Sequence, residues 1–410
     1  MPLSSHLIPL LFGSALALTS NGLGKTHRIT VEAANRDRAA HVVEFKVPAD
    51  ATEIGRVQDK AGRTLPLQIS SDRTARFVVP AQSAGEVLTF TLVLGGEAGR
   101  EGNQGVEVVR QAGHLQVHVA GKPAFAYQMD KEALPRPDIK PEYKRAGYLH
   151  PIQTPSGTIV SDDYPVQHVH HHGIWSPWTT TTFQGRTPDF WNMGKKTGTV
   201  EAVTVDWTWS GPVHGGFVAR HQFVDLSATT PITVLHETWE VTAYGVAVAA
   251  GGTPVQVFDL LLTQVCATND PLVLPKYHYG GLGFRGRGEW YGKDKANFLT
   301  SDGVTDRVKA NAQPMRWVHL SGAVDNGTAG LAVLGHPDNF RAPQPVRVHP
   351  NEPYVSFTPS QVGDWQIEPG KPYVARYRFV AADGAPDRAK LDALWNGYAV
   401  PTVARFETLP

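Results

Sequence analysis

Short runs of alternating apolar and polar residues, separated by glycine and proline, fill most of this sequence. Four such runs occur early in the chain, at residues 28–33, 41–47, 74–79 and 87–94. Because successive side chains of a strand point to opposite faces, this period of two predicts strands that each cover one side of a core. The 40 glycines and 31 prolines supply turns, and long runs of helix-forming residues are lacking. The sequence therefore predicts an all-β protein.

The runs fall into two groups. Residues 25–96 predict a small β-sandwich, and the glycine-rich stretch 95–105 has the composition of a linker. A second, larger β domain is predicted for residues 106–410, with strands near 115–120, 199–209, 217–223, 232–242, 255–264, 317–320, 330–334, 354–357 and 373–379. One short helix is expected near 387–395, because Pro386 precedes an apolar stripe there.

The N-terminus has the pattern of a secretory signal peptide. Residues 7–18 are apolar and end in Ala15-Leu16-Ala17, a small-x-small cleavage pattern, although no lysine or arginine precedes them. Residues 1–24 are therefore predicted to be removed on export to the periplasm or medium, the alternative being a strand or tail of the folded protein. No other segment approaches the ~20 apolar residues of a membrane-spanning helix, so no span is expected in the mature chain.

The charge balance and the single cysteine limit the classes of ligand and the cysteine chemistry that the sequence predicts. Lysine plus arginine equals aspartate plus glutamate, at 38 each, so the formal net charge is zero. The basic stripe expected of a nucleic-acid surface is missing, and a neutral substrate fits better. The one cysteine, Cys266, excludes an intrachain disulfide, and its apolar surroundings favour a small packed side chain over a catalytic thiol.

A histidine-rich segment, residues 167–173, is the strongest candidate for a functional site. If it is extended, His168, His170 and His172 share one face and His171 points to the other. Three imidazoles on one face could bind a transition metal, with water or substrate in a free coordination position. Without a metal, the same side chains could hydrogen-bond sugar hydroxyls or serve as acid and base. Separate structural roles in a loop are the third interpretation.

The surroundings of this segment favour a carbohydrate or a similar polyol as the ligand. Aromatic rings stack on the C–H faces of sugars, and polar groups bind the hydroxyls. The predicted substrate-binding residues are His170, His171, Trp175, Trp178, Arg186, Trp191, Asn192 and Tyr279. Core packing is the alternative for Trp175 and Trp178.

Four residues are candidates for catalysis. His172 and His278 could donate and accept protons, and Asp189 could orient a histidine or bind hydroxyls. Arg285 could hold an anionic group or a developing oxyanion. It ends a glycine-containing segment, residues 275–285, that lacks the pattern of a phosphate loop. No catalytic carboxylate is assigned, since Glu237 and Glu240 would point to opposite faces of one strand.

Four motifs together resemble the bacterial family that domain databases call "methane oxygenase PmoA". They are residues 168–175 (HVHHHGIW), 186–191 (RTPDFW), 279–285 (YGGLGFR) and 335–341 (GHPDNFR), and the resemblance covers residues 106–410. The ending at 367–379 is similar to the last strands of galactose-mutarotase-like β-supersandwiches. This resemblance implies such a fold, with a sugar held on a concave sheet face by histidine, arginine and carboxylate side chains. Methane monooxygenase subunits span the membrane several times, which this sequence does not predict.

These observations lead to one hypothesis with two alternatives. The first is an exported carbohydrate-active hydrolase, lyase or epimerase that works by general acid–base catalysis. The second is an oxygenase or hydrolase with a divalent metal on His168, His170 and His172. The third is a sugar-binding protein without catalysis.

Overall fold

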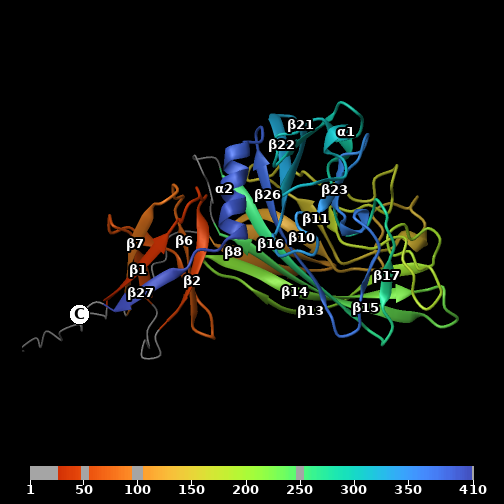
Figure 1. The fold of residues 1–410 in the computed structure, drawn as a ribbon, viewed down its shortest axis with the longest axis horizontal. Helices are drawn as coiled ribbons and strands as arrows, with labels where there is room; N and C mark the ends of the chain where they lie inside the picture. Colours follow the sequence, from red (N-terminus) through yellow and green to blue (C-terminus); the bar gives the residue numbers. More distant parts are fainter. Residues whose placement is uncertain (1–25, 48–54, 95–104, 246–253, 409–410) are drawn as a thin grey trace, which may run out of the picture.

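The computed structural model describes residues 26–47, 55–94, 105–245 and 254–408, and among these it confirms the all-β prediction. The predicted signal peptide lies outside the described residues. The N-terminal part is a sandwich of two antiparallel sheets (Figure 1). Its five-stranded sheet has the order β27 (Ala404–Thr408), β1 (Thr26–Glu32), β7 (Val87–Leu94), β3 (Gly55–Gln58) and β4 (Thr64–Leu65). Its three-stranded sheet has the order β2 (His41–Lys46), β6 (Thr74–Val79) and β5 (Leu67–Ile69).

The alternation of apolar residues explains this small sandwich. Ile29, Val43, Phe77 and Leu92 come from four of its strands and are buried together between the two sheets. The last strand, β27, pairs with β1 in antiparallel register. Figure 1 shows this blue strand beside the red N-terminal strands. Strand β27, which lies in the segment predicted to belong to the large domain, is therefore part of a sheet of the first sandwich.

The larger part consists of two further antiparallel sheets. The nine-stranded sheet has the order β20 (Gln313–Pro314), β23 (Pro345–Val348), β24 (Tyr354–Phe357), β18 (Leu282–Arg285), β12 (Ile174–Trp175), β11 (Tyr148–Ile152), β10 (Lys122–Gln128), β9 (His114–Val119) and β8 (Val106–Gln111). The eight-stranded sheet has the order β13 (Gly198–Trp209), β14 (His214–Asp225), β15 (Ile232–Tyr244), β16 (Val255–Cys266), β26 (Tyr373–Asp383), β22 (Gly327–Gly335), β21 (Trp317–Val324) and β19 (Ala296–Thr300).

The main core lies between these two sheets. Phe125 of β10 packs on Phe258 of β16 with ring centroids 4.3 Å apart, which joins the nine-stranded sheet to the eight-stranded one. A two-stranded sheet of β17 (Leu272–Leu274) and β25 (Trp365–Ile367) and the short helices η1 (Pro141–Tyr143), η3 (Gly288–Trp290), η4 (Pro359–Gln361) and α1 (Arg307–Ala310) complete the connections. Cys266 is half-buried, and its thiol donates to the carbonyl of Ile367 at 3.1 Å. No helix in the described part of the chain is long and apolar enough to cross a membrane.

Helix α2 (Arg388–Ala399) confirms the one predicted helix. It buries Leu391, Leu394 and Trp395 against strands of the eight-stranded sheet. Asp387 caps its N-terminus by accepting hydrogen bonds from the backbone N–H groups of Ala389 and Lys390, at 2.9 and 3.2 Å. The cap satisfies two donors that the first turn of a helix leaves unpaired.

Replacing Asp387 with alanine should lower the free energy of unfolding by about 1 kcal/mol, because both backbone donors lose their acceptor. Urea unfolding of the purified protein measures this change. The matched control is Asp387→Ser, which keeps a capping oxygen and should cost only a few tenths of a kcal/mol. Equal losses in the two variants would contradict the capping role.

Candidate functional site

The candidate site lies on the face of the nine-stranded sheet that points away from the main core. Trp175 of β12 pairs with Gly283 of β18, and Arg285 of β18 pairs with Tyr354 of β24. These residues alternate with side chains that enter the core, namely Ile174, Phe284 and Val355. The solvent-facing side of an antiparallel sheet usually carries scattered polar residues. The outer face of this sheet instead carries aromatic and charged side chains.

Two glycines make room for this arrangement. A Cβ atom on Gly283 would lie 3.1 Å from the Trp175 ring, so the indole lies across this glycine. A Cβ atom on Gly173, at the end of the histidine segment, would lie 2.3 Å from the carbonyl oxygen of Leu149. Gly173 leaves no room for a Cβ atom against this backbone oxygen, and at Gly283 a Cβ atom would require the indole to shift.

The histidine segment folds into two turns and lacks the extended backbone that a shared face of His168, His170 and His172 would require. The backbone N–H of His168 donates to the carbonyl of Pro165 at 3.0 Å, and that of His171 donates to the carbonyl of His168 at 2.8 Å. The rings of His168, His170 and His171 consequently gather, with centroids 4.7–5.7 Å apart. His172 is buried separately, stacked on Tyr148 at 4.2 Å.

The predicted metal ligands point in different directions. His172 Nδ1 is bonded to Asp163, and His168 Nδ1 lies 3.3 Å from Glu352 Oε1. Within the described ranges, no group of three or more histidine, cysteine, aspartate or glutamate side chains is placed to hold a metal ion. The turns remove the shared face on which the expected triad depended.

A buried arginine–glutamate pair forms the base of the site. Arg285 is fully buried, and its Nη1 forms an ion pair with Glu352. The same Nη1 lies 3.5 Å from His171 Nδ1. Burial alone would raise the pKa of Glu352, but the His168 ring and the guanidinium together lower it below the ordinary value. This lowered pKa favours the charged form of Glu352 beside the guanidinium.

Arg285 has donors to spare. Its Nε and Nη2 are buried and have no hydrogen-bond partner among the described residues. These two nitrogens form one edge of the guanidinium, with parallel N–H groups that match the two oxygens of a carboxylate. The indole Nε1 of Trp175 is likewise buried without a partner in the described part of the chain. An unpaired buried donor costs about 1–3 kcal/mol, so these groups are expected to be satisfied by a ligand or water.

His172 and Asp163 form a second pair at the site. His172 Nδ1 donates to Asp163 Oδ1 at 2.6 Å, and the Tyr148 hydroxyl donates to Asp163 Oδ2 at 2.9 Å. Burial raises the pKa of Asp163 to about 6 and lowers that of His172 well below its ordinary value. His172 Nε2 is buried and lacks a partner among the described residues. With the proton on Nδ1, Nε2 carries a lone pair that can accept a proton.

The rings of Trp175 and Tyr354 belong to a group of aromatic side chains that we call the aromatic wall, and two further predicted residues, Trp191 and Tyr279, extend it. The Trp191 ring lies 5.1 Å from Trp175 and 6.0 Å from His171, and Tyr279 lies 6.3 Å from Tyr354. His278, next to Tyr279, is mostly exposed, and partial burial together with the charge of Arg347 lowers its pKa.

Other predicted residues have different positions. Asp189 accepts hydrogen bonds from the backbone N–H groups of Trp191 and Asn192, at 3.0 Å each, and from the Asn192 side chain at 2.7 Å. It shapes a turn and does not orient a histidine. Arg186 pairs with Asp225 at 2.7 Å, at the end of β14. Trp178 lies in the main core and donates to Gln264 at 2.7 Å.

Trp178 belongs to a buried network that joins the two large sheets. Gln264 donates to Glu237 at 2.7 Å, and Glu237 lies 2.6 Å from His221 Nδ1. The other ring nitrogen of His221 lies 2.7 Å from the Tyr127 hydroxyl. Each of these groups has a partner inside the core, so the network is structural and offers no free group to a substrate.

Glu352 and Asp163 were missed by reasoning from sequence. Each lies in a short polar loop that adjoins a strand, residues 349–352 before β24 and 161–164 before the histidine segment. Neither loop carries a local pattern that identifies its partner, because Glu352 and Arg285 are 67 positions apart. Asp163 is nine positions from His172, a spacing that a search for nearby carboxylates could have used.

Replacing Arg285 with leucine should lower the free energy of unfolding by about 3 kcal/mol, because Glu352 would remain buried without its partner. Chemical unfolding followed by tryptophan fluorescence measures the change. The double variant Arg285→Leu/Glu352→Leu should recover most of the loss, since it removes both charges. A double variant less stable than the single one would contradict this explanation. The exposed pair Lys371–Glu368 is the control, and Lys371→Leu should cost less than about 1 kcal/mol.

Comparison with known proteins gives a family without a described activity. A family model described as a family of unknown function (DUF6807) matches residues 114–396, which is more than half of the chain and includes the whole candidate site. No curated protein sequence matches the chain significantly. The chain belongs to the DUF6807 family.

Proposed function

We propose that this protein is a carbohydrate-active enzyme, a hydrolase, lyase or epimerase, that acts by general acid–base catalysis at the outer face of the nine-stranded sheet. The observation that carries the proposal is a set of buried polar atoms without partners among the described residues: Arg285 Nε and Nη2, Trp175 Nε1 and His172 Nε2. They lie within one cluster of contacting side chains, beside the aromatic wall. The unpaired polar atoms favour a ligand with hydrogen-bonding groups, and the aromatic rings favour one that also has an apolar face. A sugar has both.

The chemistry can be divided between the two pairs. The free edge of Arg285 would bind a carboxylate of the sugar or stabilise a developing oxyanion. His172 Nε2 would accept the proton, since Asp163 fixes the tautomer that leaves this nitrogen free. His168 and His170, which are partly exposed, would contact hydroxyls at the entrance. A sugar acid or its glycoside is therefore the favoured substrate class.

A screen of product formation tests the proposal. Oligosaccharides with uronic acid residues and their neutral counterparts are incubated with the enzyme, with and without a chelator, and products are detected by mass spectrometry. Product from the uronic acid substrates, unaffected by the chelator, is expected. Sensitivity to the chelator would favour the metal-dependent alternative. Binding of these sugars without product under any condition would favour the non-catalytic one.

Export of the protein is part of the same proposal. The apolar segment 7–18 and the Ala15-Leu16-Ala17 pattern support a cleaved signal peptide. Such a location would give the enzyme access to polysaccharide fragments. Mass measurement of the mature chain after expression tests this point, and retention of residues 1–24 would exclude cleavage.

A further inference from the structure

A groove of about 800 Å³ lies between the N-terminal sandwich and the outer face of the eight-stranded sheet. Strands β2, β5 and β6 line one side of it, strands β13 to β16 and β26 the other, and the end of α2 closes part of it. The sandwich is fixed beside this sheet, because the Gln68 side chain accepts hydrogen bonds from the backbone N–H groups of Val213 and His214, at 3.1 and 3.0 Å. Figure 1 shows α2 standing between the two parts. The groove lies on the other large sheet from the histidine segment.

Two tryptophans of β13 lie on the groove side of the sheet. Trp209 pairs with Gly216, which pairs with Thr242, and in the same row Thr242 pairs with Asp259. A Cβ atom on Gly216 would lie 2.8 Å from the Trp209 ring, so the indole lies over this glycine. The indole N–H donates to His214 Nδ1 at 2.9 Å and fixes the ring. Trp207, two residues earlier, is 55% exposed. A fixed ring beside an exposed one forms an aromatic platform.

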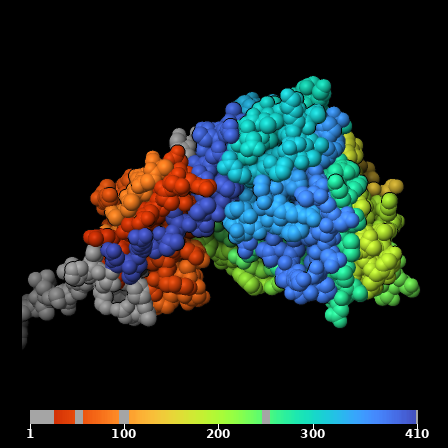
Figure 2. All heavy atoms as spheres, viewed as in Figure 1, coloured from red at the N-terminus to blue at the C-terminus, as the bar shows by residue number. Residues whose placement is uncertain are grey.

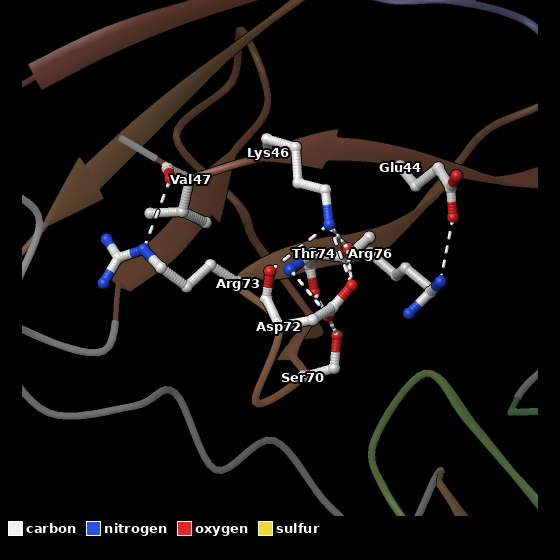
Figure 3. A network of polar contacts seen from close by, with 8 residues as sticks. All are labelled: Glu44, Lys46, Val47, Ser70, Asp72, Arg73, Thr74 and Arg76. Atoms are coloured by element: carbon white, nitrogen blue, oxygen red, sulfur yellow. Dashed lines mark hydrogen bonds and ion pairs between the residues drawn. The ribbon is translucent and has the colours of Figure 1, made fainter. Parts of the chain in front are cut away.

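Polar groups surround this platform, and most of their charges are paired. On the sandwich side, Arg76 pairs with Glu44 at 2.9 Å, as the close-up of this wall shows (Figure 3). On the sheet side, Arg378 holds Asp259 through two nitrogens at 2.7 and 2.9 Å. The exposed carboxylate of Glu240 has no ion pair among the described residues. The groove therefore has a small excess of negative charge, which disfavours anionic ligands.

One polar group in the groove needs a partner. The Tyr398 hydroxyl is buried without a hydrogen-bond partner in the described part of the chain, although its ring lies 4.7 Å from the Arg378 guanidinium. Figure 2 shows the N-terminal sandwich as a separate lobe of the surface, against which the C-terminal segment lies. A ligand that fills the space between the lobes could supply this hydrogen bond.

We infer that this groove is a second binding site, which takes a neutral oligosaccharide chain. The platform of Trp207 and Trp209 would stack on the C–H faces of successive sugar rings. The arginines of the ion pairs would donate hydrogen bonds to sugar hydroxyls, and the carboxylates, including Glu240, would accept them. The excess negative charge would disfavour binding of uronic acid chains. The volume lies within the range of about 300–1,000 Å³ that is usual for small-molecule sites. The inference is independent of the proposed catalytic site, because the two sites share no residue.

Titration calorimetry with cellohexaose, xylohexaose and mannohexaose tests the inference, with the hexamer of galacturonic acid as the anionic comparison. At least one neutral hexamer should bind, and Trp207→Ala should weaken it at least tenfold. The control variants Tyr291→Ala, an exposed aromatic residue elsewhere, and His172→Ala, at the other site, should bind as the wild type does. Circular dichroism checks that Trp207→Ala is folded, which its exposure leads us to expect.

Three outcomes would overturn the inference. They are no binding of any neutral hexamer, unchanged binding by Trp207→Ala, or tighter binding of the galacturonic acid hexamer than of the neutral ones. Weaker binding in His172→Ala equal to that in Trp207→Ala would place the sugar at the histidine site and would also overturn it. If no catalysis is found but the groove still binds a neutral hexamer, the proposed function fails and this inference stands.

Discussion

Acidification from about pH 7.5 to about pH 5 should lower the free energy of unfolding by several kcal/mol, a large share of the stability of an ordinary protein. Burial lowers the pKa of His41, His214, His319 and His349 to about 4 and that of His170 to about 3. Burial also lowers the pKa values of His171 and His172 well below the ordinary value. In the unfolded chain these groups regain the ordinary value of 6.5.

The sign follows from proton binding. Below about pH 6.5 the unfolded chain binds protons that the folded protein excludes, so stability present above that pH is lost as the pH falls toward 4. Each fully buried histidine contributes at most about 1.4 kcal/mol per pH unit. Asp163 acts in the opposite sense, because its pKa of about 6 lets the folded protein bind a proton between about pH 4 and 6.

Thermal unfolding at the two pH values measures this effect, and a single variant isolates one contribution. His319 is buried in β21, where its Nδ1 has no partner among the described residues. His319→Gln removes its titration, so the difference between the two melting temperatures should shrink. A melting temperature that is the same at both pH values would show that the histidines titrate alike in the folded and unfolded states.

The sequence predicts the strands and the helix well, because their signals are local. Alternation identified β1, β2, β6 and β7, and the proline before residue 387 located α2. Strand β27 was missed, since its only partner in the five-stranded sheet, β1, lies at the other end of the chain. Pairing over such a distance depends on the whole fold and leaves no periodic signal in five residues.

The candidate site was predicted in part, and its errors have physical reasons. Arg285, His171, His172, Trp175, Trp191 and Tyr279 do lie together. His168, His170 and His172 do not share one face, because alternate residues share a face only in a strand. The turns at Pro165 and His168 interrupt the extended backbone that this alternation requires. Asp189 was predicted to orient a histidine or bind hydroxyls, but backbone N–H groups and the Asn192 side chain donate to its oxygens. Distances between side chains decide such roles, and the sequence alone does not contain them.

Replacing His172 with alanine should lower kcat on the uronic acid substrate by a factor of about 10² to 10⁴, the usual contribution of a general base. Asp163→Asn should lower kcat by a comparable factor, because the amide no longer favours the tautomer with the proton on Nδ1. The matched control is Asp189→Asn, a change of the same size at a carboxylate that contacts only the turn. It should leave kcat close to that of the wild type.

The pH profile distinguishes this role of Asp163 from a merely structural one. Its pKa of about 6 means that kcat should fall on the acidic side of about pH 6, as the protonated carboxyl stops accepting the hydrogen bond from His172. This acidic limb should be missing from the residual activity of Asp163→Asn, since the amide does not titrate. Burial lowers the pKa of His172 well below its ordinary value, so its own protonation should not set the limb. An acidic limb that persists in Asp163→Asn, or an Asp189→Asn variant as impaired as Asp163→Asn, would show that the pair does not carry the chemistry.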